Sequence, residues 1–141
     1  MSFLLDTNVV SEWMKPQPHL GVIAWLDQVD EDRTFLSVVT LTELRYGVDR
    51  LPAGTRRKRL EDWLEHDLPL RFEGRILSID GAIADAGGRL LSQGDAAGRP
   101  MQGLDALIAA TAHVHGLTLV TRNVADFEAT TQSILNPWMQ R

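Results

Sequence analysis

The chain has 141 residues, of which 44% are hydrophobic and 23% are charged, and it contains no cysteine. This length allows one domain with a substantial core, and the lack of cysteine excludes disulfides and thiolate metal sites. The formal net charge of −5 argues against a protein that coats nucleic acid, but not against an enzyme that clusters carboxylates around a cation. The amino terminus lacks a basic segment, and no apolar run reaches membrane-spanning length. We therefore expect a cytoplasmic protein with no membrane contact.

Apolar runs alternate with helical periodicities in the first half of the chain. The run at residues 3–5 predicts a buried strand, and the capping residues that follow it predict a short helix over 9–14. Two prolines, Pro16 and Pro18, then interrupt the chain. The other elements predicted here are a helix over 20–29, a strand over 34–37, a helix over 39–51, and a helix over 55–68 capped by Thr55.

The same alternation continues in the second half. Asp80 is a capping residue between the first strand and the first helix of this half. The predicted elements are a strand over 76–79, a helix over 81–93, a loop over 94–98, a helix over 103–112 that ends at Gly116, a strand over 117–121 and a short strand over 133–135.

Residues 103–112 are nearly all apolar or small, and Asp105 stands at the front of the run. A helix without a polar face is buried on several sides, so this segment predicts a central helix. Strands and helices alternate along the whole sequence. The chain is therefore predicted to be an α/β protein with a mostly parallel central sheet sandwiched by α-helices, in a single domain over residues 1–141.

Polar side chains gather where the predicted strands end. Asp6 follows the first strand, and both Asn123 and Asp126 follow the fourth. Asp105 opens the helix that leads into that fourth strand, and Glu43 lies one and a half turns into the helix after the second. Ligand sites collect at the carboxyl ends of parallel strands, so these side chains converge if the strands that precede them are neighbours.

Three or four carboxylates at one edge repel one another, and a divalent cation relieves that repulsion. Carboxylate oxygens without a histidine or cysteine partner suit a hard ion, Mg²⁺ or Mn²⁺. A cation that keeps several waters leaves room for a phosphate and an attacking hydroxide, which indicates metal-assisted phosphodiester hydrolysis. The residues alone also allow ordinary structural roles: Asp6 and Asp105 as helix N-caps, Glu43 as an exposed helix residue, Asp126 as a turn residue and Asn123 as a loop residue.

Four segments, taken in order, resemble a PIN domain. They are FLLDTN at residues 3–8, SVVTLTELRYG at 37–47, DALIAATA at 105–112, and VTRN followed by DF within 120–127. Their order and spacing are most similar to the VapC-type and FitB-type toxins of bacterial toxin–antitoxin pairs, and the Asn-Pro-Trp sequence at 136–138 resembles that subgroup too. The resemblance covers essentially the full length of the chain.

This resemblance implies an endoribonuclease that depends on Mg²⁺ or Mn²⁺. By motif position, Asp6, Glu43 and Asp105 match the three acidic metal-site residues of the family. The fourth family position is often Asp and is Asn123 here; its amide oxygen can hold a ligand but brings no charge. The predicted catalytic residues are Asp6, Glu43, Asp105 and Asn123, the predicted metal ligands are the three acids among them, and Asp126 and Thr7 are predicted accessory residues.

The resemblance also implies an RNA substrate, a small cognate antitoxin protein and a homodimer. The apolar stripes over 20–29 and 55–68 independently favour a dimer, because they exceed what a small domain readily buries. Six basic residues between positions 45 and 59 form either a phosphate-facing patch or a solvated helix face.

Two other functions compete with the nuclease. A catalytically weak PIN-fold protein that binds RNA, or joins an antitoxin–DNA complex, is kept open by Asn123. A signalling receiver domain also combines an α/β fold with clustered acids and Mg²⁺, but it requires a lysine after a late strand. The only lysines are Lys15 and Lys58, so the receiver interpretation is weak.

Overall fold

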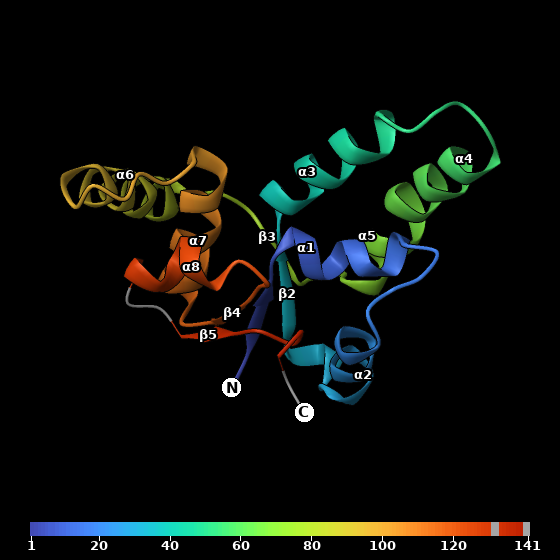
Figure 1. Cartoon of the computed structure of the whole chain (residues 1–141), viewed down its shortest axis with the longest axis horizontal. Coiled ribbons are helices and arrows are strands. Elements are labelled where there is room, and N and C mark those ends of the chain that lie inside the picture. Colours follow the sequence, from blue (N-terminus) through green and yellow to red (C-terminus); the bar gives the residue numbers. More distant parts are fainter. Residues whose placement is uncertain (131–132, 140–141) are drawn as a thin grey trace.

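A parallel sheet forms the centre of the molecule (Figure 1). The computed structural model describes residues 1–130 and 133–139, and within them five strands form one sheet in the order β3-β2-β1-β4-β5. The pairings are parallel, and Leu4 lies opposite Phe35 on one side and Leu119 on the other. The strands are β1 (Phe3–Leu5), β2 (Thr34–Ser37), β3 (Ile76–Leu77), β4 (Thr118–Val120) and β5 (Ile134–Leu135).

Successive residues of the central strands point to opposite faces of the sheet, so each face has its own hydrophobic core. Leu4 and Leu119 belong to one core, whereas Leu5 and Val120 belong to the other. All four side chains are fully buried. A strand that is covered on both faces needs apolar residues at every position, which is why these strands appear in the sequence as continuous apolar runs.

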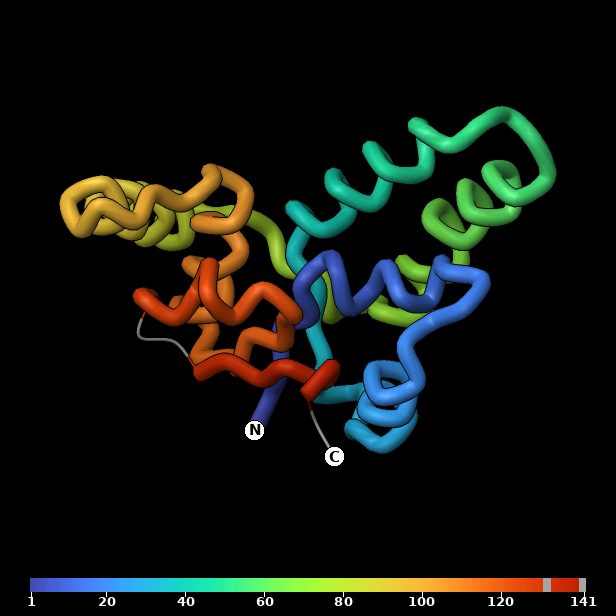
Figure 2. The backbone as a smooth tube through the Cα atoms, viewed as in Figure 1, coloured from blue at the N-terminus to red at the C-terminus, as the bar shows by residue number. Residues whose placement is uncertain are grey.

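The helices cover both faces of the sheet and lie in two groups on either side of it (Figure 2). Residues of α6, α7 and α8 pack on the core that contains Leu4, and residues of α2, α4 and α5 pack on the core that contains Leu5. The predicted α/β sandwich is therefore confirmed. The helical elements are α1 (Thr7–Val10), η1 (Ser11–Met14), α2 (Leu20–Gln28), η2 (Glu31–Arg33), α3 (Val38–Asp49), α4 (Thr55–Asp62), η3 (Trp63–Asp67), α5 (Leu68–Arg71), α6 (Gly81–Ala96), α7 (Gly103–His115), α8 (Val124–Phe127) and η4 (Glu128–Thr130).

The helix predicted over 55–68 is correctly located but is not continuous. Gly54, not Thr55, is its N-cap residue. A π-helical turn, η3, separates α4 from α5, and Pro69 occupies the first turn of α5. Proline has no N–H for the carbonyl four residues earlier and its ring crowds that carbonyl, so the chain widens locally before it.

Helix α6 is longer than predicted, so the expected loop over 94–98 is wrong in its first part. A Cβ on Gly94 would lie only 2.7 Å from the carbonyl oxygen of Arg99. Glycine at this position therefore lets the next segment fold back against the helix. The turn that follows contains Gly98, whose φ of 71° is costly for any other residue.

Helix α7 is buried as predicted and fixes the position of Asp105. Residues 108–112 are fully buried, and Gly116 ends the helix in the left-handed conformation. Helix α6 packs closely on it, because a Cβ on Gly87 would meet Leu107 Cδ2 at 3.1 Å. The first turn of α7 is therefore held by a rigid helix pair.

Most of the apolar stripes that favoured a dimer pack within the chain, although Leu20 is 83% exposed. Val22 and Leu26 of α2 are buried in the core that contains Leu5, as are Leu60 and Leu64. Little surplus apolar surface therefore remains on these two segments, and the homodimer stays a prediction from the resemblance. No helix among the described residues is long and apolar enough to cross a membrane.

The basic segment lies on α3 and α4, on an arm that Figure 1 shows away from α7 and α8. Arg45 donates to Glu65 at 2.9 Å, and Arg57 donates to Glu61 at 2.9 Å. Because these arginines are neutralised by ion pairs within the chain, the solvated helix face is favoured over a phosphate-facing patch.

Candidate functional site

The carboxyl ends of β1 and β4 meet where the strand order reverses. From β1 the chain builds β2 and β3 on one side, and it then returns to place β4 and β5 on the other. Such a switch point leaves a crevice in which parallel α/β proteins bind ligands. A groove of about 350 Å³ lies here, and its lining includes Asp6, Thr7, Glu43, Asp105 and Asn123. The four predicted catalytic residues thus share one groove with Thr7.

Asp6 is the most deeply buried of the predicted metal ligands, with 4% of its surface exposed. It is the N-cap of α1, and its Oδ1 accepts a 2.7 Å hydrogen bond from the backbone N–H of Thr7. Burial raises the pKa of Asp6 to about 6, against the opposing effect of its hydrogen bonds, and the charges of Asp105 and Glu43 raise it further. A carboxylate held this way gains strongly from a nearby cation.

Thr121 fixes the second oxygen of Asp6. Its hydroxyl donates to Asp6 Oδ2 at 2.8 Å and accepts the backbone N–H of Asn123 at 3.0 Å. The Asn8 amide adds hydrogen bonds to Asp6 Oδ2 at 3.4 Å and to the Thr121 hydroxyl at 3.3 Å. These contacts tie the loop after β4 to the end of β1 and hold the carboxylate in one orientation.

Glu43 reaches the groove from the second turn of α3. Its Oε1 accepts a 2.5 Å hydrogen bond from the Thr7 hydroxyl, which also lies 3.2 Å from the Thr40 hydroxyl. Thr7 therefore links α1 to α3 and positions one oxygen of Glu43. Glu43 is half-buried, so the purely exposed helix residue that the sequence allowed is wrong.

Asp105 lies in the first turn of α7 rather than at its cap. The N-cap residue is Gln102, so the capping role that the sequence allowed for Asp105 is wrong. The side chain is half-buried, and burial raises its pKa, with further contributions from the charges of Glu43 and Asp126. Asp105 is therefore not the helix cap, and its carboxylate is repelled by those of Glu43 and Asp126.

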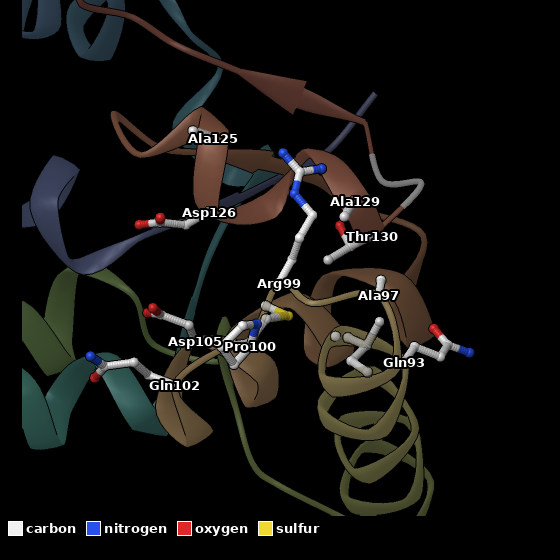
Figure 3. Close-up of a pocket in the computed structure, with 13 residues that line it drawn as sticks. Gln93, Ala97, Arg99, Pro100, Gln102, Asp105, Ala125, Asp126, Ala129 and Thr130 are labelled. Atoms are coloured by element: carbon white, nitrogen blue, oxygen red, sulfur yellow. The ribbon is translucent and has the colours of Figure 1, made fainter.

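Asn123 and Asp126 have different positions. Asn123 is the N-cap residue of α8, its side chain makes no capping hydrogen bond, and it faces the groove. Its backbone is not left-handed, with φ of −89° and ψ of 56°. Asp126 lies in the first turn of α8 and lines a neighbouring pocket with Asp105 (Figure 3). Asp126 is thus beside the groove and not part of its lining.

The chemistry of the groove fits a hard divalent cation. The oxygen donors that line it include those of Asp6, Glu43 and Asp105, and burial together with neighbouring negative charges raises the pKa of both aspartates. Among the described residues, no three His, Asp or Glu side chains are close enough to enclose a metal ion. Mg²⁺ commonly uses only one or two protein carboxylates and retains several waters, so this open arrangement suits it better than an all-protein cage would.

Several residues of the groove were not predicted from the sequence. Lys15, Arg122 and Trp138 line the same groove as the acids, and the Arg122 guanidinium lies 5.6 Å from the Trp138 ring centre. Asn8 supports Asp6 directly. The signal for Asn8 was its position two residues after Asp6. Nothing in the sequence predicts that Lys15 and Trp138, which are 123 positions apart, line the same groove.

Together, the parallel sheet and its acidic groove define an α/β protein with a carboxylate site at the carboxyl edge of the sheet. The family model for the PIN domain matches residues 3–131, and the chain belongs to that family. The resemblance found in the sequence is thereby confirmed.

Similar proteins span nearly the whole chain. Toxin FitB of Neisseria gonorrhoeae is 40% identical over 135 residues, covering 96% of this chain and 97% of its own. VapC ribonuclease Y4jK of Sinorhizobium fredii is 38% identical, covering 96% of each chain. The solved structure of FitAB bound to an IR36 DNA fragment superposes with a TM-score of 0.92 at 37% identity, covering 99% of this chain and 97% of that one. These relatives are therefore similar to this protein in sequence, and the FitAB structure is similar to it in backbone as well.

Proposed function

We propose that this protein is a divalent-metal-dependent endoribonuclease that acts as the toxin of a toxin–antitoxin pair. One observation carries the proposal: Asp6, Glu43 and Asp105 line one groove at the switch point of the sheet. The relatives named as a toxin and as a ribonuclease, which match over nearly the full chain, support the assignment. On this view residues 1–141 act as a single PIN domain in the cytoplasm.

Asp6 and Asp105 would hold the cation, with Glu43 binding it directly or through a water. The oxygen-only donor set suits Mg²⁺ or Mn²⁺. When bound, the ion supplies charge neutralisation at a phosphate and lowers the pKa of a coordinated water. The raised pKa of Asp6 means that this residue must lose its proton for the site to load, so loading improves as the pH rises through about 6.

Hydrolysis of the phosphodiester requires a water oxygen to bond to phosphorus while one P–O ester bond breaks. The water proton must go to a base, and the departing oxygen gains a proton from a solvent water. Glu43 is suited to accept the first proton, because the Thr7 hydroxyl engages its Oε1 and leaves the other oxygen for the water. Asn123 is suited to orient a water or the substrate phosphate through its uncharged amide.

The partners follow from the same proposal. The substrate would be RNA, and a small cognate antitoxin would bind the toxin and block the acidic groove. The similar structure that contains FitAB on a DNA fragment supports a second role in a DNA-bound toxin–antitoxin complex. A homodimer is proposed from family resemblance, without support from the apolar stripes.

Cleavage of total cellular RNA with end-mapping tests the activity. The wild type, Asp105→Asn and Asp95→Asn would each be assayed in EDTA, Mg²⁺ and Mn²⁺. Asp95 is exposed on α6 and therefore provides a matched control for the charge change. We expect metal-dependent cleavage by the wild type and Asp95→Asn and at least a hundredfold loss in Asp105→Asn. Normal cleavage by a folded Asp105→Asn protein would refute the assignment.

A catalytically weak binding protein is the second candidate, and the uncharged Asn123 favours it. Calorimetric titration with Mn²⁺, run beside the cleavage assay, separates the two functions. Retained RNA binding without metal binding or cleavage would identify a binding protein. Toxicity provides an independent test: verified soluble overexpression without growth arrest would contradict the toxin role.

A further inference from the structure

A second cavity of about 460 Å³ adjoins the acidic groove, and Asp105 belongs to the lining of both. It lies between the end of α6, the segment that leads into α7, and the α8–η4 region (Figure 3). The nuclease chemistry proposed above leaves this cavity without a role. A group bound in it would lie beside Asp105, one of the proposed metal ligands.

The walls of this cavity are fixed by backbone contacts. The Arg99 N–H donates to the Gly94 carbonyl at 2.8 Å, which ties the segment to α6. A side chain at Gly94 would clash with the Arg99 carbonyl, since a Cβ there would lie 2.7 Å from that oxygen. At the other end, the Ala106 N–H donates to the Gln102 carbonyl at 3.0 Å. Backbone hydrogen bonds thus hold the segment that forms one wall of the cavity in a defined position.

The lining combines apolar walls with charged groups at the rim. Leu90 and Met101 are half-buried and pack on the core of the molecule. Arg99 extends across the cavity toward α8, and Asp126 lies on that side near Asp105 (Figure 3). The contact of Arg99 with Glu128 is 3.4 Å long and exposed, so it costs little to replace.

We infer that this cavity receives one unstacked base of the RNA, that of the nucleotide next to the cleaved phosphodiester, and that Arg99 contacts its edge. The inference rests on the proposed ribonuclease function. Unstacked bases are read by hydrogen bonds at their edges, with their faces against aromatic side chains, Arg guanidinium planes or apolar side chains. The cavity offers apolar surfaces, a guanidinium donor and the carboxylate acceptor of Asp126. Because Asp105 also lines the acidic groove, the cavity and the proposed metal site are adjacent.

Substitutions at neighbouring alanines test the cavity. Ala97→Leu fills it, whereas Ala96→Leu adds the same side chain at the adjacent exposed position outside the lining. Arg99→Gln removes the charge at the rim. Each variant would cleave a randomised single-stranded RNA library with the ends mapped, and each would bind fluorescein-labelled RNA heptamers in EDTA by anisotropy.

We expect Ala97→Leu and Arg99→Gln to lose the base preference at one position next to the cut and to bind the heptamers about tenfold more weakly. Ala96→Leu should match the wild type in both assays. Unchanged cleavage preference and unchanged heptamer binding in Ala97→Leu would overturn the inference. Failure of the wild type to cleave with any metal would instead overturn the nuclease proposal, and the anisotropy result would still decide whether RNA occupies the cavity.

Discussion

The Thr121 hydroxyl at the end of β4 donates to Asp6 Oδ2 at the end of β1, across a distance of 2.8 Å. The two residues are 115 positions apart in the sequence, yet their strands are hydrogen-bonded neighbours. The bond joins both sides of the switch point, and both residues are buried. It therefore links the stability of the fold to the geometry of the proposed metal ligand.

Replacing Thr121 with valine keeps the shape and removes this donor. We expect Thr121→Val to destabilise the protein by about 1–3 kcal/mol at pH 8, because a buried carboxylate loses a hydrogen bond. The pKa of Asp6 should rise further, since that bond favours its charged form. Urea unfolding measures the first effect. Thr121→Ser, which retains the hydroxyl, is the control, and equal losses in both variants would show that packing rather than the hydrogen bond is responsible.

The raised pKa of Asp6 predicts how stability depends on pH in EDTA. The folded protein binds the Asp6 proton more tightly than the unfolded chain does, with a pKa of about 6 against 3.8. The resulting stabilisation is complete below pH 3.8, is lost as the pH rises toward 6, and is absent above it. About two pKa units correspond to about 3 kcal/mol.

Asp6→Asn removes this dependence. In EDTA the variant should be more stable than the wild type by up to about 3 kcal/mol at pH 8, and the difference should shrink as the pH falls to 4.5. Urea unfolding at both pH values measures it. Added Mn²⁺ should stabilise only the wild type. A variant that is less stable than the wild type at pH 8 would contradict the prediction that the ionised Asp6 side chain destabilises the folded protein.

Short buried strands made the site predictable from the sequence. Asp6 directly follows a strand that is apolar at every position, so its place at the sheet edge follows from the strand alone. Asp105 lies in the first turn of a helix that is otherwise mostly apolar, so its carboxylate lies at the amino-terminal end of that helix. These positions depend on local sequence and on the parallel topology, both of which the residues indicate.

Other features depend on contacts between distant segments and could not be predicted. Gly94 has the character of a helix breaker in the sequence, yet it lies inside α6. Glycine is needed there because a Cβ would lie 2.7 Å from the Arg99 carbonyl oxygen. Arg122 and Lys15 enter the groove from separate elements. Neither contact leaves a periodic signal in the sequence.

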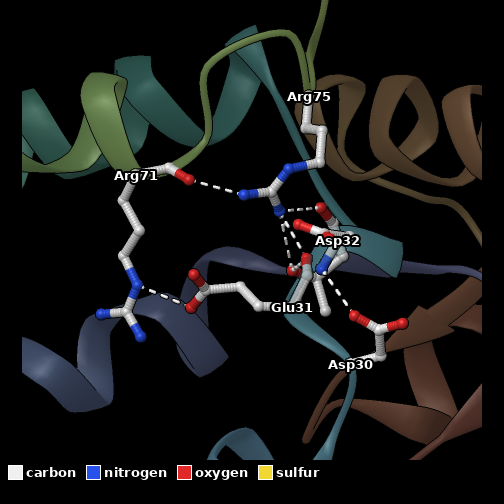
Figure 4. A network of polar contacts seen from close by, with 6 residues as sticks. Asp30, Glu31, Asp32, Arg71 and Arg75 are labelled. Carbon is white, nitrogen blue, oxygen red and sulfur yellow. Dashed lines mark hydrogen bonds and ion pairs between the residues drawn. The ribbon is translucent and has the colours of Figure 1, made fainter.

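Arg75 joins the segment before β2 to the end of α5 (Figure 4). Its guanidinium donates to the backbone carbonyls of Glu31 at 2.5 Å, Thr34 at 2.7 Å and Arg71 at 2.5 Å. We expect Arg75→Ala to lower the free energy of unfolding by about 2–4 kcal/mol, because several carbonyls lose a charged donor.

Arg89→Ala is the matched control for that loss, since the Arg89–Asp85 pair is exposed and is worth at most about 0.5 kcal/mol. Urea unfolding of both variants measures the difference. RNA cleavage per folded molecule should stay unchanged in Arg75→Ala, because this network does not contact the groove. Equal stability changes in the two variants would show that the Arg75 network contributes no more than a surface ion pair.

Asn123 is the position at which the groove lacks a charge. Replacing it with aspartate adds a carboxylate to a lining that already contains Asp6 and Asp105. We expect Asn123→Asp to bind Mn²⁺ about tenfold more tightly, because affinity for hard cations rises with the charge of the ligand set. In EDTA the same variant should be slightly less stable, since the new carboxylate repels the others.

Calorimetric titration with Mn²⁺ at pH 8 measures the change. Gln28→Glu adds the same unit of charge at an exposed position of α2 outside the groove and is the control. Asn123→Ala should bind the ion no more tightly than the wild type, because it adds no ligand. If Asn123→Asp and Gln28→Glu raise the affinity equally, the gain is a net-charge effect, and Asn123 does not face the bound cation.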